Sequence, residues 1–419
     1  MATTRTFNAM LNQYLPNKLL REELIEKNYI LKTCRKDNNW KGGSLIVPFR
    51  GAESSSVAFG ALTGSTDIAE SELVRGSIST QPELWGSLIF NQRDLQEHDG
   101  KIPESTFLRI LPDEIDYFMK YLNEVVSIQL GTGPHFATAT GYGTAGDASD
   151  GQYIVDHPER MYLGQKTSLD DDNSAATDAY VIAIDMNTKI VEFSATRGGA
   201  AANLSAYTVA QNAKFYHPGA QAAPMTSMRS VFLSLANGGS ANVHGVAKTA
   251  YPFLQAINVS GATITSTNVI EKIFDSYTEV CKLGKGTANK VLMSYKHLGS
   301  VLKSLQVSKG GFQVVKEPVG KTQQFGWSEI VLASVKSGMA LTLVGIQEMD
   351  DDIMPFVNFD TLVFRSNGFF RKRKAPDGKE YFEIRNTSGY QYICDVCLFG
   401  DMEYSKPGEN AIIHSIPNY

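Results

Sequence analysis

Apolar residues recur at helical spacing in two long segments of the chain. The first is PDEIDYFMKYLNEVVSIQLG, residues 112–131, whose apolar face carries Ile115, Phe118, Met119, Leu122, Val125 and Val126. Pro112 suits a first helical turn, and an earlier start at Ser105 with a kink at Pro112 is the alternative. The second segment, residues 267–283, ends before a glycine. Both segments are predicted to be amphipathic helices.

Shorter apolar segments before the first helix predict two strands, Ser44–Phe49 and Leu84–Leu95. Residues 51–77 between them, GAESSSVAFGALTGSTDIAESELVRGS, show neither a helical stripe nor sustained alternation. Single apolar residues are scattered through this stretch, at Val57, Phe59, Leu62 and Ile68. We therefore expect the two strands to pair as a long hairpin, whose tip cannot bury itself within its own fold.

The period changes again after the first helix. Residues 131–152, rich in Gly, Ala and Thr, read as a connector. Short strands separated by turn signals follow, at Tyr153–His157, Met161–Leu169, Ala179–Asp185, Lys189–Ser194 and Lys214–His217. Residues 153–217 are therefore predicted to form a small inserted β barrel.

The remaining pattern is mixed. Helices are predicted in SVFLSLANGG and HLGSVLKSLQ, and strands in KVLMSY, EIVLASV, ALTLVGIQEM and TLVFRS. YFEI is expected to pair with GFFRKRK across Ala375–Gly378, and YQYICDVCLFGDMEY to close the sheet. The chain as a whole is predicted to belong to the α+β class.

Composition narrows the classes of function. The chain has 419 residues, 42% hydrophobic and 20% charged, with a formal net charge of -5, so no global basic field points to nucleic acid. Its four cysteines are too few for a disulfide scaffold. The first residues lack the apolar core of a signal peptide, and no run approaches the roughly 18 apolar residues of a membrane span. We expect a soluble protein of a reducing compartment, without removal of a pro-segment.

Two kinds of motif are candidates for metal binding. Cys394 and Cys397 form a CxxC pair, but residues three apart on a strand point to opposite faces, and zinc needs four ligands. We therefore expect strand cysteines with one packed inward. The triplets Asp170–Asp172 and Asp350–Asp352 lack the spaced pattern of a calcium loop, which favours solvated turns and leaves a bridging calcium as the alternative. No cofactor is predicted.

The sequence contains no recognisable catalytic motif. Gly320-Lys321-Thr322 resembles the end of a phosphate-binding loop, but position 315 is Val where that loop needs Gly. None of the seven histidines lies in an HExxH motif, and no GxSxG motif occurs. The basic run Arg371–Lys374 suits either phosphates or a solvated hairpin end. The hairpin tip cannot pack within its own fold, and the sequence contains no catalytic motif. Together these observations indicate a protein that functions through contacts made by its surface.

The order of these elements, with phrases such as TDIAESELVRGSIS and ELWGSLIFNQRDL, resembles the major capsid proteins of tailed phages, which have the HK97-type fold. The resemblance covers nearly the whole chain. It implies six consecutive parts: an N-terminal arm (1–43), an extended loop hairpin (44–100), a peripheral domain with a spine helix (101–150), an inserted β domain (151–218), an axial domain (219–345) and return strands of the peripheral domain (346–419).

The resemblance also implies a function and partners. The chain would be a structural subunit of hexamers and pentamers in an icosahedral phage head that encloses double-stranded DNA, assembled in the bacterial cytoplasm. Expected partners are further copies of the chain, DNA contacted non-specifically, and scaffolding, portal and decoration proteins; no membrane and no enzymatic activity are expected. The loop would contact a neighbouring subunit through Phe59, Leu62, Ile68, Glu70, Glu72 and Arg75.

Two features depart from the pattern of some family members. Residues 51–77 contain no Lys, and the nearest are Lys41 and Lys101, so a covalent link from the loop to a neighbour is not expected. The spine helix begins near 105–112, after the arm and loop, which leaves no room for a fused scaffolding segment. Contacts between subunits are therefore expected to be non-covalent, and scaffolding to come from another chain.

Two other functions stay open at this point. An encapsulin-type nanocompartment shell shares the implied fold, although the inserted barrel counts against it. A carbohydrate-binding or enzymatic protein would use the barrel as its working module, with Tyr153, Tyr162 and Tyr180 lining a groove. A cargo peptide bound to small shells would favour the first, and glycan binding the second.

Overall fold

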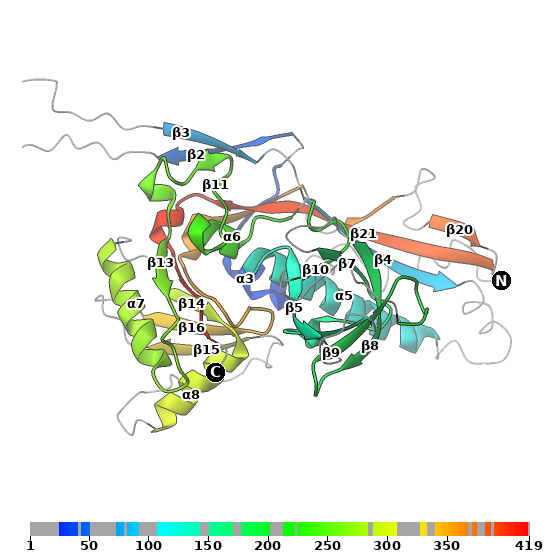
Figure 1. The fold of residues 1–419 in the computed structure, drawn as a ribbon. Helices are drawn as coiled ribbons and strands as arrows, with labels where there is room; N and C mark the ends of the chain where they lie inside the picture. The colour runs from blue at the N-terminus through cyan, green and yellow to red at the C-terminus, as the bar shows by residue number, and fades with distance from the viewer. Residues whose placement is uncertain are drawn as a thin grey trace, which may run out of the picture. The chain divides into compact units, whose positions relative to one another are not determined.

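The computed structural model consists of two compact units, Met1–Ser127 with Met228–Tyr419 and Ile128–Ser227 (Figure 1). The chain passes from the first unit to the second near the end of helix α5, Phe107–Gly131. The structure describes residues 25–40, 43–50, 73–78, 82–91, 107–142, 151–170, 177–201, 213–222, 224–283, 288–307, 327–332, 340–367, 371–374, 382–386 and 389–417.

Helix α5 confirms the first helical stripe. Ile115, Met119, Leu122 and Val126 are all buried, as their spacing of three and four residues requires. The helix begins at Phe107, so Pro112 lies within it and not at its first turn, which agrees with the alternative of an earlier start.

A six-stranded sheet forms one core of the first unit. Its order is β13 (Ile257–Ser260), β22 (Ala411–His414), β17 (Met354–Val357), β14 (Lys290–Met293), β16 (Leu341–Ile346) and β15 (Trp327–Leu332). Helices α7 (Val269–Leu283) and α8 (Tyr295–Val307) share a hydrophobic core with this sheet. Because β17 and β22 are paired here, strands from the expected return segment belong to the same sheet as strands from the expected axial domain.

A second sheet is built around the long strand β21, Gly389–Tyr404, coloured orange-red in Figure 1. It pairs with β4 (Glu83–Asn91), β18 (Leu362–Ser366), β19 (Arg371–Lys372) and β20 (Phe382–Asn386), and β1 (Arg35–Asp37) joins β18. The predicted pairing of YFEI with GFFRKRK is wrong for the described residues, because β19 and β20 each pair with β21. Both Cys394 and Cys397 are buried, so the expectation of one inward cysteine is also wrong.

The hairpin pairing predicted near the N-terminus is wrong too. Strand β2, Leu45–Arg50, pairs with β3, Leu73–Ile78, which lies at the end of the stretch read as a structureless tip. The segment expected to pair with β2 is instead β4, which pairs with β21 about three hundred residues later in the chain. Non-local pairing decides this, and no turn signal near either strand encodes it.

Short elements complete the first unit. They are α3 (Tyr29–Thr33), α6 (Met228–Phe232), the strands β11 (Asn242–Val243) and β12 (Val246–Ala247), and the 3-10 helices η4 (Leu235–Asn237), η5 (Pro252–Leu254), η6 (Phe359–Thr361) and η7 (Pro407–Glu409). Asn28 caps α3, since its side-chain oxygen accepts the N–H of Leu31.

The second unit is a closed antiparallel barrel. Its strands, in order around the barrel, are β10 (Lys214–Tyr216), β5 (His135–Tyr142), β6 (Gln152–Val155), β9 (Ile190–Ser194), β8 (Thr177–Asp185) and β7 (Lys166–Asp170), and η2 (Pro158–Arg160) lies between β6 and β7. Strand β5 lies in the segment predicted to be a connector, so that prediction is wrong for residues 135–142. Its small residues suit an interior crowded by aromatic rings.

Aromatic side chains fill the barrel. Phe193 and Phe215 stack with ring centroids 5.0 Å apart, and Tyr153 meets Phe193 edge-on at 5.9 Å. Tyr153 is fully buried, so it lines no surface groove and the proposed tyrosine-lined binding face loses that residue. Tyr162 is exposed and Tyr180 partly buried.

Candidate functional site

The hairpin of β2 and β3 presents one buried and one exposed face. Val47, Phe49 and Ile78 are buried, whereas Ile46 is 62% and Leu73 73% exposed. Strand geometry produces this division, because alternate side chains point to opposite faces. The exposed face therefore offers large apolar side chains to a partner.

The buried face of the hairpin rests on the turn between β11 and β12. In this turn His244 and Gly245 have φ angles of +48° and +80°, as two-residue hairpins of type I′ require. The N–H of Ser77 donates to the carbonyl oxygen of His244 at 2.7 Å. The sequence NVHGVA contained this signal, a positive-φ pair between apolar residues, and sequence reasoning missed it.

His244 connects the hairpin to strand β21. Its ring stacks on Phe49 at 6.1 Å and on Tyr404 at 6.2 Å between centroids. The backbone N–H of Tyr404 donates to His244 Nε2 at 3.0 Å, which requires an unprotonated nitrogen. Burial lowers the pKa of His244 to about 4, so the ring is neutral at pH 7.

Gly76 allows this close packing. A Cβ atom at position 76 would lie 2.6 Å from Phe49 Cε2 and 3.0 Å from the carbonyl oxygen of His244. No side chain fits there without displacing the ring or the turn. We call the contact of Phe49, Gly76 and Ser77 with His244 the hairpin anchor.

Arg75 is the one predicted interface residue that the structure describes. It lies exposed on β3, where its backbone is paired with Pro48. Phe59, Leu62, Ile68, Glu70 and Glu72 lie outside the described residues, so the structure does not bring the predicted set together.

The basic run is packed against aromatic rings. Arg371 lies over Phe399 at 5.0 Å and Arg373 over Trp85 at 5.4 Å, measured to the ring centroids. Lys372 is buried, so the reading of a fully solvated hairpin end is wrong at that position. The guanidinium groups are oriented by these contacts at a sheet face on which Trp85 is 44% exposed.

The second acidic triplet holds an arginine. Arg229 of α6 contacts Asp350 at 3.1 Å and Asp352 at 2.6 Å, while Lys296 lies 3.7 Å from Asp351. Asp350 is buried, so the expected solvated turn is wrong here. Protein cations already face these carboxylates. Of the first triplet only the backbone of Asp170 is described.

Two further residues with reactive side chains, Cys34 and His217, are buried within the fold. Burial raises the pKa of the Cys34 thiol to about 11 and lowers the pKa of His217 to about 4.

Within the described ranges, no three His, Cys, Asp or Glu residues are grouped as metal ligands would be. No helix in the described part of the chain is long and apolar enough to cross a membrane. Residues 320–322 lie outside the described residues.

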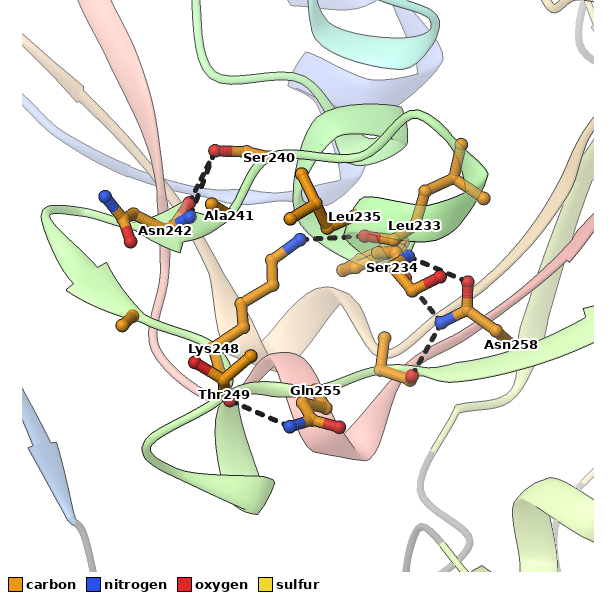
Figure 2. Close-up of a pocket in the computed structure, with 13 residues that line it drawn as sticks. Leu233, Ser234, Leu235, Ser240, Ala241, Asn242, Lys248, Thr249, Gln255 and Asn258 are labelled. Atoms are coloured by element: carbon orange, nitrogen blue, oxygen red, sulfur yellow. Dashed lines mark hydrogen bonds between the residues drawn. The ribbon is translucent and has the colours of Figure 1, made fainter.

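A pocket of about 240 Å³ lies beside α6 and the β11–β12 hairpin (Figure 2). Its walls include Phe232, Leu233, Ala247 and Ala256. Lys248 runs across it, and its Nζ donates to the carbonyl oxygens of Ser230 at 2.9 Å and Leu233 at 2.8 Å. Burial lowers the pKa of Lys248 to about 8. Sequence analysis did not single out this lysine, because its neighbours form no known motif.

Comparison with solved structures finds a similar overall fold in a chain of a phage capsid. A chain of the cyanophage A-1(L) capsid asymmetric unit matches with a TM-score of 0.50 and 11% identity, over 94% of this chain and 92% of that one. A chain of the capsid of the native GTA particle matches with a TM-score of 0.47 and 10% identity, over 92% and 89%. No protein-family model matches the sequence, and no curated protein matches it. The chain therefore has the fold of a phage capsid protein.

Proposed function

We propose that this chain is the major capsid protein of a tailed phage, with the HK97-type arrangement of parts. It assembles into hexamers and pentamers of an icosahedral head that encloses double-stranded DNA. The capsid fold supports the proposal, and the hairpin anchor is the single observation that carries it: one hairpin face is fixed to the subunit, and the other presents exposed Ile46 and Leu73.

The parts are proposed to follow the division implied by the sequence. Residues 1–43 form the arm and 44–100 the extended loop, and α5 is the spine helix of the peripheral domain, 101–150 in the division implied by the sequence. The inserted domain, 151–218 in that division, is extended to include β5 (His135–Tyr142), because β5 is a strand of the same barrel. Residues 219–345 form the axial domain and 346–419 the return strands. The anchor then determines where the extended loop leaves its subunit.

Assembly in this proposal depends on non-covalent contacts. The exposed face of β2 and β3 packs on a neighbouring subunit, where Phe59, Leu62, Ile68, Glu70, Glu72 and Arg75 add apolar contacts and ion pairs. Many modest contacts of this kind stabilise a shell through multivalency. Scaffolding, portal and decoration proteins are proposed as further partners, and the chain acts as a structural protein in the virion.

Deleting part of the loop tests this proposal. The register of β2 with β3 limits the deletion to 53–71, joined by a short Gly-Ser linker, so that both strands keep their pairing. The variant is expected to fold with unchanged far-UV circular dichroism but to form no stable shells in electron microscopy, whereas the intact chain forms closed shells. Unchanged shells after the deletion would refute the assigned role of the loop.

The same images test the nanocompartment alternative. Small shells that co-purify with a cargo peptide would favour it over a phage head. A chain that stays monomeric under all conditions, even with phage partner proteins, would exclude both shell functions.

A further inference from the structure

Lys248 places a buried amine at the end of helix α6. The residue is 6% exposed, and its two acceptors, the carbonyl oxygens of Ser230 and Leu233, lie at the carboxyl end of that short helix. A cation is favoured there, because the terminal carbonyls lack helical partners. These two hydrogen bonds give Lys248 a structural role. They leave the third N–H donor of its ammonium group to be explained.

A protonated lysine has three N–H donors, and Lys248 uses two of them. Within the described part of the chain, no third acceptor lies at hydrogen-bond distance from its Nζ, and no carboxylate lines the pocket. Burying a cation without an opposite charge is costly. The pocket therefore holds an uncompensated positive charge with one donor to spare.

Two amide side chains of the pocket, those of Asn258 and Gln255, are engaged within the protein. Asn258 donates to the carbonyl oxygens of Phe232 and Ala256 and accepts the N–H of Ser234 (Figure 2). Gln255 donates to the carbonyl oxygen of Lys248 at 2.8 Å. A ligand would therefore meet the third N–H of buried Lys248, the exposed side chains of Asn242 and Thr249, and walls that are mainly aliphatic and aromatic.

We propose that this pocket binds a single carboxylate with a short aliphatic body, which accepts the third N–H of Lys248. The volume of about 240 Å³ is below the ~300–1,000 Å³ typical of sites for drug-sized ligands, which fits such a small group. The carboxylate comes from a free short-chain acid or from an Asp or Glu side chain of a second copy. The second source rests on the proposed shell function, and the first does not.

Protonation links this binding to pH. Lys248 is the only titratable residue among those that line the pocket. Of the charged or titratable groups on the neighbouring elements, Arg229 of α6 is paired with Asp350 and Asp352, and His244 of the β11–β12 turn accepts from Tyr404. Since burial lowers the pKa of Lys248 to about 8, binding weakens as the pH rises above 8. A bound carboxylate raises this pKa.

A titration of the full chain with sodium butyrate tests the site. Lysine labelled with ¹³C and ¹⁵N gives an NMR signal for the Lys248 amine, followed at constant ionic strength against sodium chloride. The signal is expected to shift saturably with butyrate, and the pKa of Lys248 to rise by about 1 to 3. A shift no larger than that produced by chloride would overturn the proposal.

Two variants and a matched control locate the response. Lys248→Met removes the amine, and Ala247→Leu fills the pocket while keeping the amine visible, which covers the case in which Lys248→Met fails to fold. Both should lose at least tenfold in butyrate affinity. Lys282→Met, at an exposed position in the last turn of α7, should bind as the unchanged chain does. Equal binding by Ala247→Leu would overturn the site.

Carbodiimide coupling distinguishes the two sources of the carboxylate. The carbodiimide takes up one carboxylate oxygen and two hydrogens of the Lys248 ammonium group and becomes a urea. Lys248 Nζ keeps one hydrogen and forms an amide bond with the carboxyl carbon. A peptide linking Lys248 to an acidic residue, found by mass spectrometry in assembled shells and absent from monomers, supports a second copy as the source. Its absence from shells overturns that source. If no shells form, the proposed function is wrong. The butyrate titration does not depend on shells, so it still shows whether the pocket binds a carboxylate.

Discussion

The barrel of the second unit and the β2–β3 hairpin of the first are both made of short antiparallel strands, yet they bury their side chains differently. Every barrel strand has two strand neighbours, and alternate residues such as Phe193 and Phe215 point into a closed aromatic core. Among the described residues, β2 and β3 pair only with each other, and one hairpin face stays open.

The barrel is therefore stabilised by contacts among its own strands, whereas the hairpin depends on contacts with other parts of the molecule. The barrel satisfies its backbone hydrogen bonds by closure, which removes its edges. The hairpin depends on the anchor at His244 for one face and, in the proposed function, on a neighbouring subunit for the other. A region built in this way keeps its apolar surface for assembly.

Phe193→Ala should give the largest effect and should be confined to the barrel. Removing a buried aromatic ring costs about 3–5 kcal/mol of unfolding free energy. Hydrogen exchange measured by mass spectrometry should show lost protection in residues 128–227 and unchanged protection in β2 and β3. Met186→Ala, at a 54% exposed position in the β8–β9 turn, is the control. An equal loss in the hairpin would contradict the independence of the two regions.

Acidification should loosen the hairpin anchor through His244. The pKa of His244 is lowered from 6.5 to about 4 in the folded chain, so the unfolded chain binds the proton first as the pH falls. Stability is therefore present above pH 6.5 and lost progressively down to about pH 4, by up to about 3 kcal/mol. Exchange protection of β2 and β3 should fall over this range.

His244→Gln sharpens this test, because glutamine offers an acceptor to the N–H of Tyr404 but does not titrate. The variant should show little pH dependence of hairpin protection between pH 6.5 and 4. If it responds to acid as the unchanged chain does, another group controls the anchor.

Gly76→Ala should disturb the anchor by overpacking. The new methyl group would meet Phe49 and the His244 carbonyl, and crowding of this kind costs about 1–3 kcal/mol. Urea denaturation should report the loss, with lower protection in β2 and β3. Gly299→Ala is the matched control: its Cβ would meet nothing within 4 Å in α8, so it should stabilise the chain by about 0.5–1 kcal/mol.

Ile46→Ser and Leu73→Ser should have the smallest effect on the subunit. Both side chains are exposed, so the free energy of unfolding should change by no more than about 0.5 kcal/mol. Assembly yield, measured by sedimentation of shells, should nevertheless fall. Normal shells from the double variant would show that the open face is not an interface.

The sequence predicted the long helices correctly because their signal is local. In α7 the buried Val269, Ile273, Tyr277 and Val280 repeat at the helical period, and the helix ends at Leu283 before a glycine. Most barrel strands were found for the same reason, since alternation and turn residues lie close together in the chain. Strand β5 was missed because its Gly and Thr residues resemble a loop.

Most features of the candidate site depend on contacts between distant residues. Ser87 of β4 donates to Asp395 of β21, 308 positions away, and no pattern near either residue encodes that partner. The same holds for Arg229 with the acidic triplet at 350–352, which sequence reasoning placed in solvent. Only the chain's three-dimensional path brings these charges together.

The sequence by itself determined the α+β class, the main helices and the absence of a known catalytic motif, because periodicity and motif spacing are properties of neighbouring residues. Tertiary structure alone decided that β2 pairs with β3, that His244 holds that pair, and that Lys248 lies buried beside a pocket. Each of these depends on burial and on partners supplied from elsewhere in the chain. Burial also lowers the pKa values of His244 and Lys248, a property that local sequence cannot carry.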